Sequence, residues 1–243
     1  MTITVFDDAD ALAHELAVRV LGAIARQPSI VLGLPTGRTP QPFYAALRAQ
    51  AEARRTDWSQ VRTFNLDEFV GVGADDPGSY HAYMERELFG VVEVARQHIG
   101  FLDGCAADLA AECERYERAI AAAGGIDLMV LGIGANGHIG FNEPAPGLHA
   151  RTHRARLEAG TRASNADLFD GDVARVPDEG LSMGMATILR ARSVVLIATG
   201  EEKTVAVEGM LRGPITTRLP ASFLQLHPAA AVLLDRAARP MEA

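Results

Sequence analysis

Short apolar runs alternate with amphipathic helical patterns along the whole chain, and this alternation constrains the fold more than any other feature. The apolar runs span residues 2–6, 29–33, 61–65, 126–131, 193–198 and 230–234. The helical patterns span residues 10–25, 41–53, 79–89 and 106–123. Such runs are typical of strands covered on both faces, and strands joined through helices pair in parallel. The sequence therefore predicts an α/β fold, a three-layer sandwich around a mostly parallel sheet.

One long segment interrupts this pattern. Residues 144–179 are polar, rich in arginine and weakly periodic. A segment of that length without strong periodicity is usually a lid or a binding loop. The chain has no internal repeat and no linker, and 243 residues are enough for one full core. We therefore expect a single domain, residues 1–243, with a mobile lid within residues 144–179.

The composition excludes several classes of function. A formal net charge of -8 gives no electrostatic footprint for nucleic acid. No apolar run approaches the roughly 20 residues that span a bilayer, and the amino terminus lacks the pattern of a signal peptide. Cys105 and Cys113 are too few for a disulfide scaffold, and we expect both to be buried free thiols. These features predict a cytoplasmic protein that binds neither nucleic acid nor membranes.

A loop rich in glycine and threonine follows the run at 29–33. It contains Thr36, Gly37, Arg38 and Thr39, and it precedes a predicted helix. Free backbone N–H groups, hydroxyls and the helix dipole suit such a loop to a phosphate group. It is not a Walker loop, because the Gly-Lys-Ser/Thr ending is absent. The alternative is a tight strand-to-helix turn that a threonine caps.

Two adjacent acids, Asp67 and Glu68, follow the run at 61–65. In an extended conformation their side chains point to opposite faces, so that one enters a cleft while the other is solvated or paired. A carboxylate in a cleft can act as a base on a C–H beside a carbonyl, particularly where burial raises its pKa. The alternative is that these acids cap the next helix.

A third loop, residues 132–144, follows the apolar run at 126–131. Its glycines match the G-x-G-x-x-G pattern of dinucleotide sites, but Gly140 and Pro144 disfavour the helix that this pattern requires. The loop instead displays Asn136, His138 and Glu143. A histidine flanked by a carboxylate and an amide is held in one tautomer for proton transfer. The alternative is a structural histidine in a turn.

The chain uses lysine once. Lys203 is the only lysine among 23 basic residues, and all the others are arginine. A lone ammonium indicates a site where a compact charge fits and a planar guanidinium does not. The alternative is an arbitrary residue on a helix face.

Five segments of the chain carry a joint pattern. They are residues 32–37 (LGLPTG), 63–68 (TFNLDE), 79–81 (SYH), 134–144 (GANGHIGFNEP) and 224–228 (LQLHP). Together they resemble the glucosamine-6-phosphate deaminase family over nearly the whole chain. The resemblance implies a Rossmann-like fold and conversion of glucosamine 6-phosphate and water to fructose 6-phosphate and ammonia, without a cofactor or a metal.

The resemblance also implies a role for each candidate residue. Asp67 matches the base that moves a proton between C2 and C1 of the open-chain sugar. His138 matches the residue that opens the pyranose ring, and Glu143 matches its charge partner. Residues 36–39 match the phosphate loop, and Lys203 matches a phosphate-binding lysine. Ring opening and C2 deprotonation need two separate acid–base groups, and the sequence supplies them on separate loops.

The chain departs from the family pattern at the following positions. Asn136 stands where some members carry an aspartate beside the histidine, and an amide orients the ring without adding charge. Asp167 stands where the family has a phosphate-binding arginine. We therefore expect Arg38 or Arg162 to replace that arginine, or the ligand to differ at its sixth carbon. Basic residues that allosteric members use for N-acetylglucosamine 6-phosphate are also absent, so we expect no such activation.

Other interpretations stay open. They are a deaminase or isomerase for a different amino sugar phosphate, a 6-phosphogluconolactonase, and a non-catalytic sugar-phosphate sensor. The lactonases lack the Phe-Asn-Glu-Pro continuation and need no base like Asp67, and the sensors normally carry a DNA-binding segment. The expected partner is a sugar phosphate, and the expected state is a monomer or small homo-oligomer.

Overall fold

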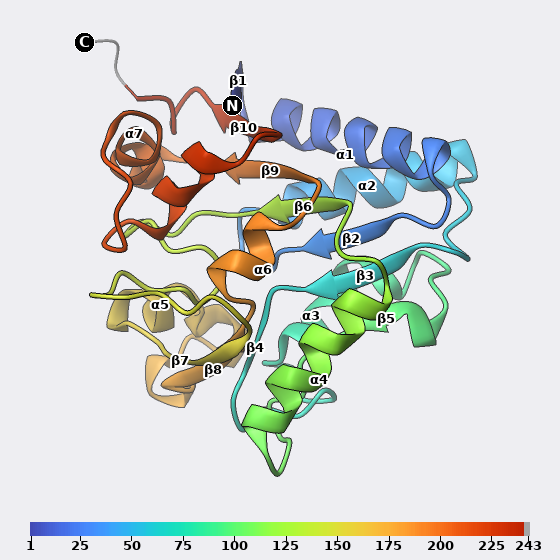
Figure 1. Ribbon diagram of the computed structural model, residues 1–243. Coiled ribbons are helices and arrows are strands. Elements are labelled where there is room, and N and C mark those ends of the chain that lie inside the picture. The colour runs from blue at the N-terminus through green and yellow to red at the C-terminus, as the bar shows by residue number, and fades with distance from the viewer. Residues whose placement is uncertain (241–243) are drawn as a thin grey trace.

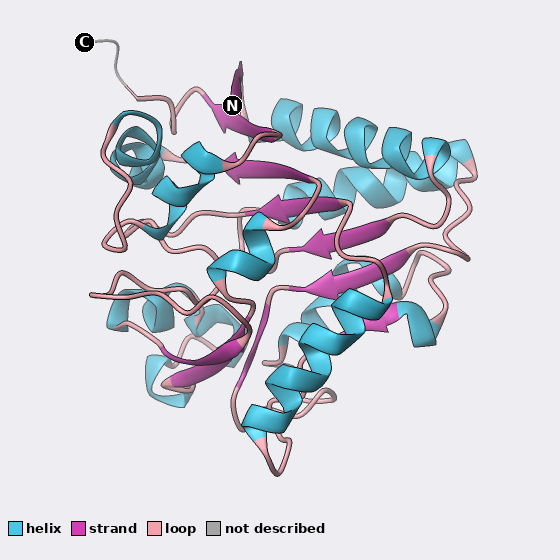
Figure 2. Ribbon diagram, in the orientation of Figure 1, coloured by secondary structure: helices cyan, strands magenta, loops and turns pink. Residues whose placement is uncertain are grey.

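Seven parallel strands form the central sheet of the computed structural model, which describes residues 1–240 (Figures 1 and 2). In spatial order they are β1 (Thr2–Phe6), β10 (Ala230–Asp235), β9 (Ser193–Ala198), β6 (Leu128–Leu131), β2 (Val31–Leu34), β3 (Arg62–Asn65) and β5 (Ile99–Gly100). All six apolar runs lie in this sheet, which confirms the predicted α/β fold. Only the two-residue strand β5 has no counterpart among the predicted runs.

Helices cover both faces of the sheet, as Figure 1 shows. One layer contains α1 (Ala9–Arg26), α2 (Gln41–Arg54) and α3 (Tyr80–Met84), the last continued by a π-helical turn over Glu85–Phe89. The other layer contains α4 (Leu109–Ala122), α6 (Met185–Leu189) and α7 (Thr204–Arg212). The structure therefore has the predicted three layers.

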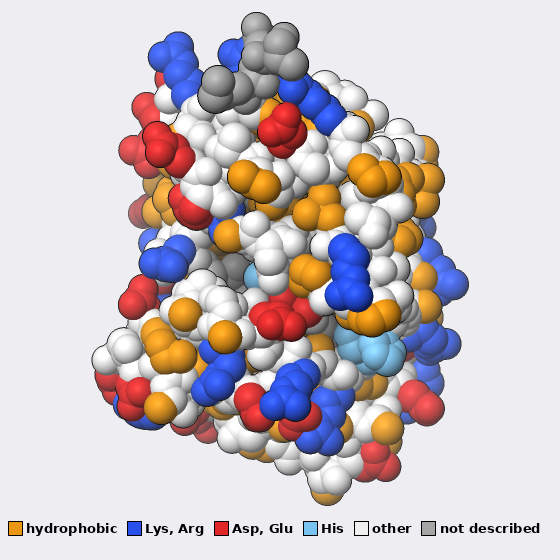
Figure 3. Space-filling model, turned by 90° about the vertical axis from the view of Figure 1, so that its left-hand side faces the viewer, with side chains coloured by type: hydrophobic (Ala, Val, Ile, Leu, Met, Phe, Trp, Pro, Cys, Tyr) orange, Lys and Arg blue, Asp and Glu red, His pale blue; other side chains and the backbone are white. Residues whose placement is uncertain are grey.

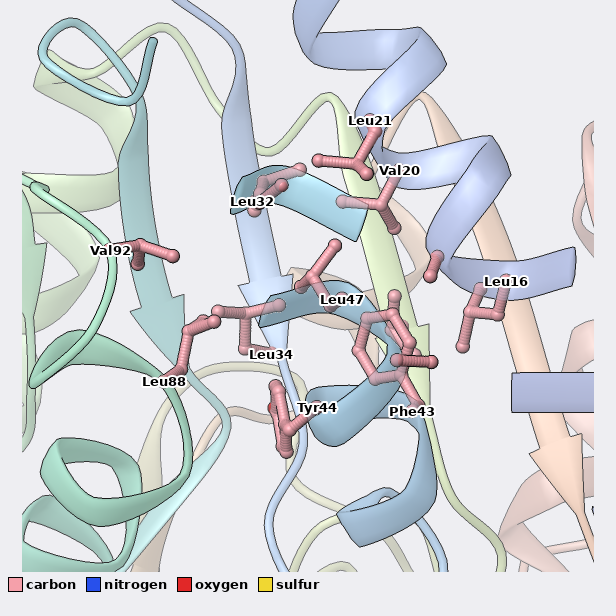
Figure 4. Packing of buried hydrophobic residues seen from close by; sticks show 14 of the residues in the cluster. Leu16, Val20, Leu21, Leu32, Leu34, Phe43, Tyr44, Leu47, Leu88 and Val92 are labelled. Atoms are coloured by element: carbon pink, nitrogen blue, oxygen red, sulfur yellow. The ribbon is translucent and has the colours of Figure 1, made fainter. Parts of the chain in front are cut away.

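Alternation of side chains along the strands divides the apolar residues between these layers. In β6, Leu128 and Val130 pack against the α1–α2 layer, while Met129 and Leu131 pack against the opposite layer. Figure 4 shows the first layer from close by, with α1, β2 and α2 all contributing side chains. Each fully buried leucine or valine contributes about 1.5–3 kcal/mol, so these two layers hold the sheet in place.

Side-chain caps fix where helices α1 and α4 begin. Asp8 accepts from the backbone N–H of Ala11 at the start of α1, and Asp108 caps α4 in the same way. The cap at Asp108 starts α4 three residues later than predicted, and Cys105 lies in a turn that precedes the helix. The expectation that both cysteines are buried is correct for Cys113 and wrong for Cys105, which is exposed.

A second, three-stranded antiparallel sheet packs beside the first, and the sequence did not predict it. It consists of β4 (Asp67–Phe69), β8 (Glu179–Ser182) and β7 (His153–Arg156). Part of the predicted lid therefore forms regular structure: β7, helix α5 (Ala159–Ser164) and two short 3-10 turns all lie within 144–179. Whether this segment moves stays a prediction.

An aromatic cluster holds the small sheet together. The ring of Phe69, which is fully buried, lies 4.7 Å from Tyr80, 5.4 Å from Phe141 and 5.5 Å from Phe169, measured between ring centroids. These four rings come from β4, α3, the 132–144 loop and the 144–179 segment. The cluster therefore fixes the relative positions of segments that are distant in sequence.

None of the helices formed by residues 1–240 combines the length and the apolar character that crossing a membrane requires.

Replacement of Phe69 by alanine tests the importance of this cluster. Phe69→Ala removes a buried ring with three aromatic neighbours and is expected to lower the free energy of unfolding by about 3–5 kcal/mol. The control Val205→Ala changes a side chain that is 80% exposed. It is expected to change the free energy of unfolding by less than about 0.5 kcal/mol. Urea unfolding followed by circular dichroism measures both. Equal effects of the two substitutions would contradict this packing.

Candidate active site

A cleft of about 850 Å³ opens at the carboxyl ends of the central strands. Its walls come from the loops that follow β2, β3, β6 and β9, four neighbouring strands in the middle of the sheet, together with residues of α3 and α5. Figure 3 looks onto this side of the molecule, where acidic and basic side chains intermingle. Eight of the predicted site residues line the cleft: Thr36, Gly37, Arg38, Thr39, Asp67, Asn136, His138 and Lys203. The ninth, Glu143, does not line the cleft itself. Its carboxylate lies beside the ring of His138 and accepts a hydrogen bond from Asn136.

The predicted phosphate loop is held from below by two tyrosines. The hydroxyl of Tyr44 donates to the carbonyl of Pro35 at 2.5 Å, and that of Tyr83 donates to the carbonyl of Gly37 at 2.7 Å. Gly37 has a φ of +100°, a conformation that glycine adopts without strain. Helix α2 starts directly after this loop and has no side-chain cap, so its positive end faces the cleft unneutralised.

Two cations lie at this end of the cleft. Lys203 precedes α7 and is partly buried. Burial lowers the pKa of its ammonium, the neighbouring Glu202 carboxylate opposes this change, and the charge of Arg38 adds to it. The like charges of Arg38 and Lys203 repel each other, and both residues line the cleft. An anion bound between them would relieve that repulsion.

Asp167 and Arg162 have different surroundings. Arg38 Nη1 lies 3.8 Å from Asp167 Oδ2, and both side chains are largely exposed. Arg162 instead donates to the carbonyls of Val173 and Val176, both at 3.1 Å, and does not line the cleft. Of the two arginines expected to replace the missing phosphate-binding arginine, Arg38 lines the cleft and Arg162 does not.

Asp67 is the first residue of β4 and is almost completely buried. Burial, followed by the nearby charge of Glu68, raises the pKa of its carboxyl to about 8, and a long hydrogen bond of 3.5 Å from Thr36 Oγ1 opposes the rise. Gly140 packs directly against Asp67. It belongs to the loop of residues 132–144 that contains His138, here called the histidine loop. A Cβ at Gly140 would lie 3.3 Å from Asp67 Oδ2, so this glycine lets the two loops approach closely.

Glu68 points away from the cleft, as strand alternation predicts. Its carboxylate accepts backbone N–H groups from Phe69 at 2.8 Å, Tyr80 at 3.0 Å and His81 at 2.9 Å. The last two belong to the first turn of α3. Glu68 therefore caps α3 and fixes it to β4, so the helix-capping alternative holds for Glu68, while Asp67 lies in the cleft as predicted.

The histidine loop forms turns rather than a helix, as predicted. His138 Nδ1 lies 3.4 Å from Glu143 Oε2, and Asn136 Nδ2 donates to the same oxygen at 2.9 Å. The ring of His138 packs on Gly134, where any side chain would collide with it. Burial opposes ionisation of Glu143, but the hydrogen bond and charge of His138, then hydrogen bonds from Thr161 and Asn136, lower its pKa to about 2.

Several residues of the site were not predicted. Tyr80, Thr161 and Asn165 line the cleft, and the Tyr80 hydroxyl donates to Asn165 Oδ1 at 2.9 Å. The segments that contain them stand out in the sequence, but no spacing rule shows that α5 turns toward the histidine loop. Within residues 1–240 there is no group of three or more His, Cys, Asp or Glu side chains that could hold a metal ion.

The fold is similar to that of solved proteins. A structure of a monomeric glucosamine-6-phosphate deaminase matches with a TM-score of 0.95 and 38% sequence identity, covering 98% of each chain. The 6-phosphogluconolactonase from Trypanosoma cruzi matches with a TM-score of 0.76 and 20% identity, covering 98% of this chain and 95% of the other. At that identity the second likeness shows a shared fold alone.

Sequence relatives agree with the first of these structures. Glucosamine-6-phosphate deaminase of Rhodopirellula baltica is 47% identical over 236 residues, which are 97% of this chain and 94% of the relative. The deaminase of Streptomyces avermitilis is 44% identical over 238 residues, 98% of this chain and 91% of the relative. The family model of glucosamine-6-phosphate isomerases and 6-phosphogluconolactonase matches residues 7–233. The chain therefore belongs to the glucosamine-6-phosphate isomerase/6-phosphogluconolactonase family.

Proposed function

We propose that this protein is a glucosamine-6-phosphate deaminase, which converts glucosamine 6-phosphate and water to fructose 6-phosphate and ammonia. The observation that carries the proposal is a buried carboxyl, Asp67, in the same cleft as the His138–Glu143 pair and the loop at residues 36–39. The reaction needs a base, a separate proton shuttle and an anion site. The names of the relatives support the same activity.

Ring opening is assigned to His138. The closed sugar has no acidic C–H, so the C1–O5 bond must break first. His138 takes the proton of the O1 hydroxyl and returns it to O5, which leaves an aldehyde at C1. Glu143 is ionised and hydrogen-bonded to the same ring, so it stabilises the imidazolium that forms between the two transfers.

Deamination is assigned to Asp67. Its carboxylate removes the proton from C2, the electron pair forms a C1–C2 double bond, and O1 takes a proton from the substrate ammonium. Asp67 then returns its proton to C1, which leaves an iminium at C2. Water adds to this carbon and ammonia leaves. A base with a pKa near neutrality is suited to both halves of the transfer.

The phosphate end of the substrate is assigned to residues 36–39 and Lys203. Backbone N–H groups and the α2 dipole favour the dianion, and Arg38 and Lys203 supply charge. Helix α5 contributes residues to the wall of the cleft, which supports a lid role for residues 144–179. Asp167 leaves a different amino sugar phosphate as the second candidate substrate.

The protein's state and location follow as further inferences. We infer a monomer, because the fold matches a monomeric deaminase over nearly its whole length. We infer a cytoplasmic location, since the exposed thiol of Cys105 is unpaired and such thiols persist in a reducing compartment.

Ammonia release tests the proposed activity directly. The protein is expected to release ammonia faster from glucosamine 6-phosphate than from galactosamine 6-phosphate or unphosphorylated glucosamine. Asp67→Asn is expected to lower kcat by about 10²–10⁴-fold, because the base is lost. Its affinity for the substrate with C1 reduced to an alcohol should be unchanged within a few-fold. The control Asp7→Asn alters an exposed carboxylate and should behave as the wild type. Near-normal turnover by Asp67→Asn would reject the assignment.

The pH profile tests the raised pKa of Asp67. The carboxylate is the active form, so kcat/KM is expected to rise with pH through a pKa near 8 and to level off above it. Glu68→Gln removes a neighbouring negative charge, which lowers the pKa of Asp67 and moves the rising limb to lower pH. The substrate's own ionisations are common to both proteins and cancel in the comparison. Coincident profiles of two folded proteins would contradict this coupling.

Paired substitutions test the phosphate end of the cleft. Arg38→Ala is expected to raise KM by about 10-fold or more, because a charge-assisted hydrogen bond is lost. Asp167→Ala frees Arg38 from an exposed ion pair and is expected to lower KM by about 2–5-fold. Arg118→Ala, an exposed arginine on α4, serves as the control. Steady-state kinetics with glucosamine 6-phosphate measures all three, and changes of Arg38 and Asp167 in the same direction would contradict the assignment.

A further inference from the structure

Thr161 of α5 packs against the His138–Glu143 pair, although neither the sequence patterns nor the assigned steps give it a role. Its side chain is only 3% exposed. The hydroxyl Oγ1 lies 2.5 Å from Glu143 Oε1 and 3.3 Å from His138 Nδ1. It therefore bridges the carboxylate and the imidazole that the first step uses.

The number of protons in this group determines the direction of each hydrogen bond. A hydroxyl has one proton to donate, and an ionised carboxylate can only accept. Since Glu143 is ionised, Thr161 donates to Glu143 Oε1. Only lone pairs of Oγ1 then face His138 Nδ1, so Nδ1 must carry the hydrogen that lies between them. The same N–H faces Glu143 Oε2 at 3.4 Å.

This assignment leaves the other ring nitrogen as the active one. In a neutral imidazole with hydrogen on Nδ1, Nε2 holds a free lone pair. Nε2 has no hydrogen-bond partner within residues 1–240, and His138 lines the cleft. It is therefore the atom available to accept a proton from a ligand.

We propose that Thr161 is a positioning residue that holds His138 in the Nδ1–H tautomer and thereby makes Nε2 the atom that moves the proton during ring opening. The catalytic part of this proposal rests on the proposed deaminase function. The tautomer assignment is independent of that function, because it follows from the two hydrogen bonds of Thr161 and the ionised carboxylate of Glu143.

Neighbouring side chains hold the backbone of Thr161 in place. Ser164 Oγ donates to the Thr161 carbonyl at 2.8 Å, and Asn165 Nδ2 donates to it at 2.9 Å. The backbone N–H of Glu158, just before α5, also donates to Glu143 Oε1 at 3.3 Å. Helix α5 is thus tied to the histidine loop at two points, and the ring-opening group is complete only when α5 is docked.

The tautomer can be measured without turnover. Nitrogen-15 NMR of His138 near neutral pH is expected to show hydrogen on Nδ1 in the wild type and in Thr161→Ser, which keeps the hydroxyl. In Thr161→Val, which has the same shape without the hydroxyl, the Nε2–H form is expected to appear. Hydrogen on Nε2 in the wild type would overturn the proposal, whether or not any variant folds. An unchanged tautomer in Thr161→Val would overturn it as well.

Kinetics then separates positioning from general damage. Thr161→Val is expected to lower kcat with glucosamine 6-phosphate by about 10-fold or more, and Thr161→Ser to restore most of it. The 4,5-dideoxy analogue of glucosamine 6-phosphate lacks both hydroxyls that could close a ring. Thr161→Val should therefore turn over this analogue at nearly the wild-type rate. Equal losses on both substrates would overturn the positioning role. Thr187 donates a similar hydrogen bond to Glu117, outside the cleft. Thr187→Val removes this bond and serves as the control for lost stability.

The two proposals fail in different ways. If Thr161→Val shifts the tautomer but the wild type releases no ammonia from any amino sugar phosphate, the deaminase function is wrong and the tautomer assignment stands. If the wild type is an active deaminase and Thr161→Val loses neither tautomer nor rate, the positioning role is wrong and the function stands.

Discussion

The chain leaves the central sheet at Leu66 and enters the small antiparallel sheet one residue later, and the whole site depends on this transition. β3 ends at Asn65, and β4 begins at Asp67. The side chain at 67 therefore faces the cleft while the next one anchors α3. Asp67 is opposite Ser182 in β8, whose hydroxyl accepts the backbone N–H of Phe141 at 3.0 Å. The passage of the chain from β3 to β4 thus connects the central sheet, the small sheet and the histidine loop.

Two carboxyl groups at this cleft have pKa values moved in opposite directions. The pKa of Asp67 rises to about 8, because burial and a second acid disfavour its charge. The pKa of Glu143 falls to about 2, because His138, Thr161 and Asn136 compensate for its burial. Groups separated in this way suit different tasks: one exchanges protons near neutrality, and the other remains a fixed charge. The surroundings, and not the residue type, assign the roles.

The sequence is most informative where one physical pattern repeats. Apolar runs such as 126–131 and 193–198 predict the parallel sheet, because strands buried on both faces leave a continuous signal. β4, β7 and β8 are short and partly polar, so no such signal exists for them. Loop composition correctly predicted that Asp67 and His138 lie in one cleft, since loops after parallel strands meet at one edge. Thr161 and the orientation of Arg162 depend on how residues 144–179 fold back, which is a tertiary property.

Lys203 has a consequence beyond its charge. It is the only lysine of the chain, and it faces the cleft. Its depressed pKa increases the share of the neutral, nucleophilic amine. An acylating reagent that reacts with side-chain amines therefore has one lysine to modify in this protein, Lys203. Acylation of Lys203 would remove one of the two positive charges, those of Arg38 and Lys203, that line the cleft.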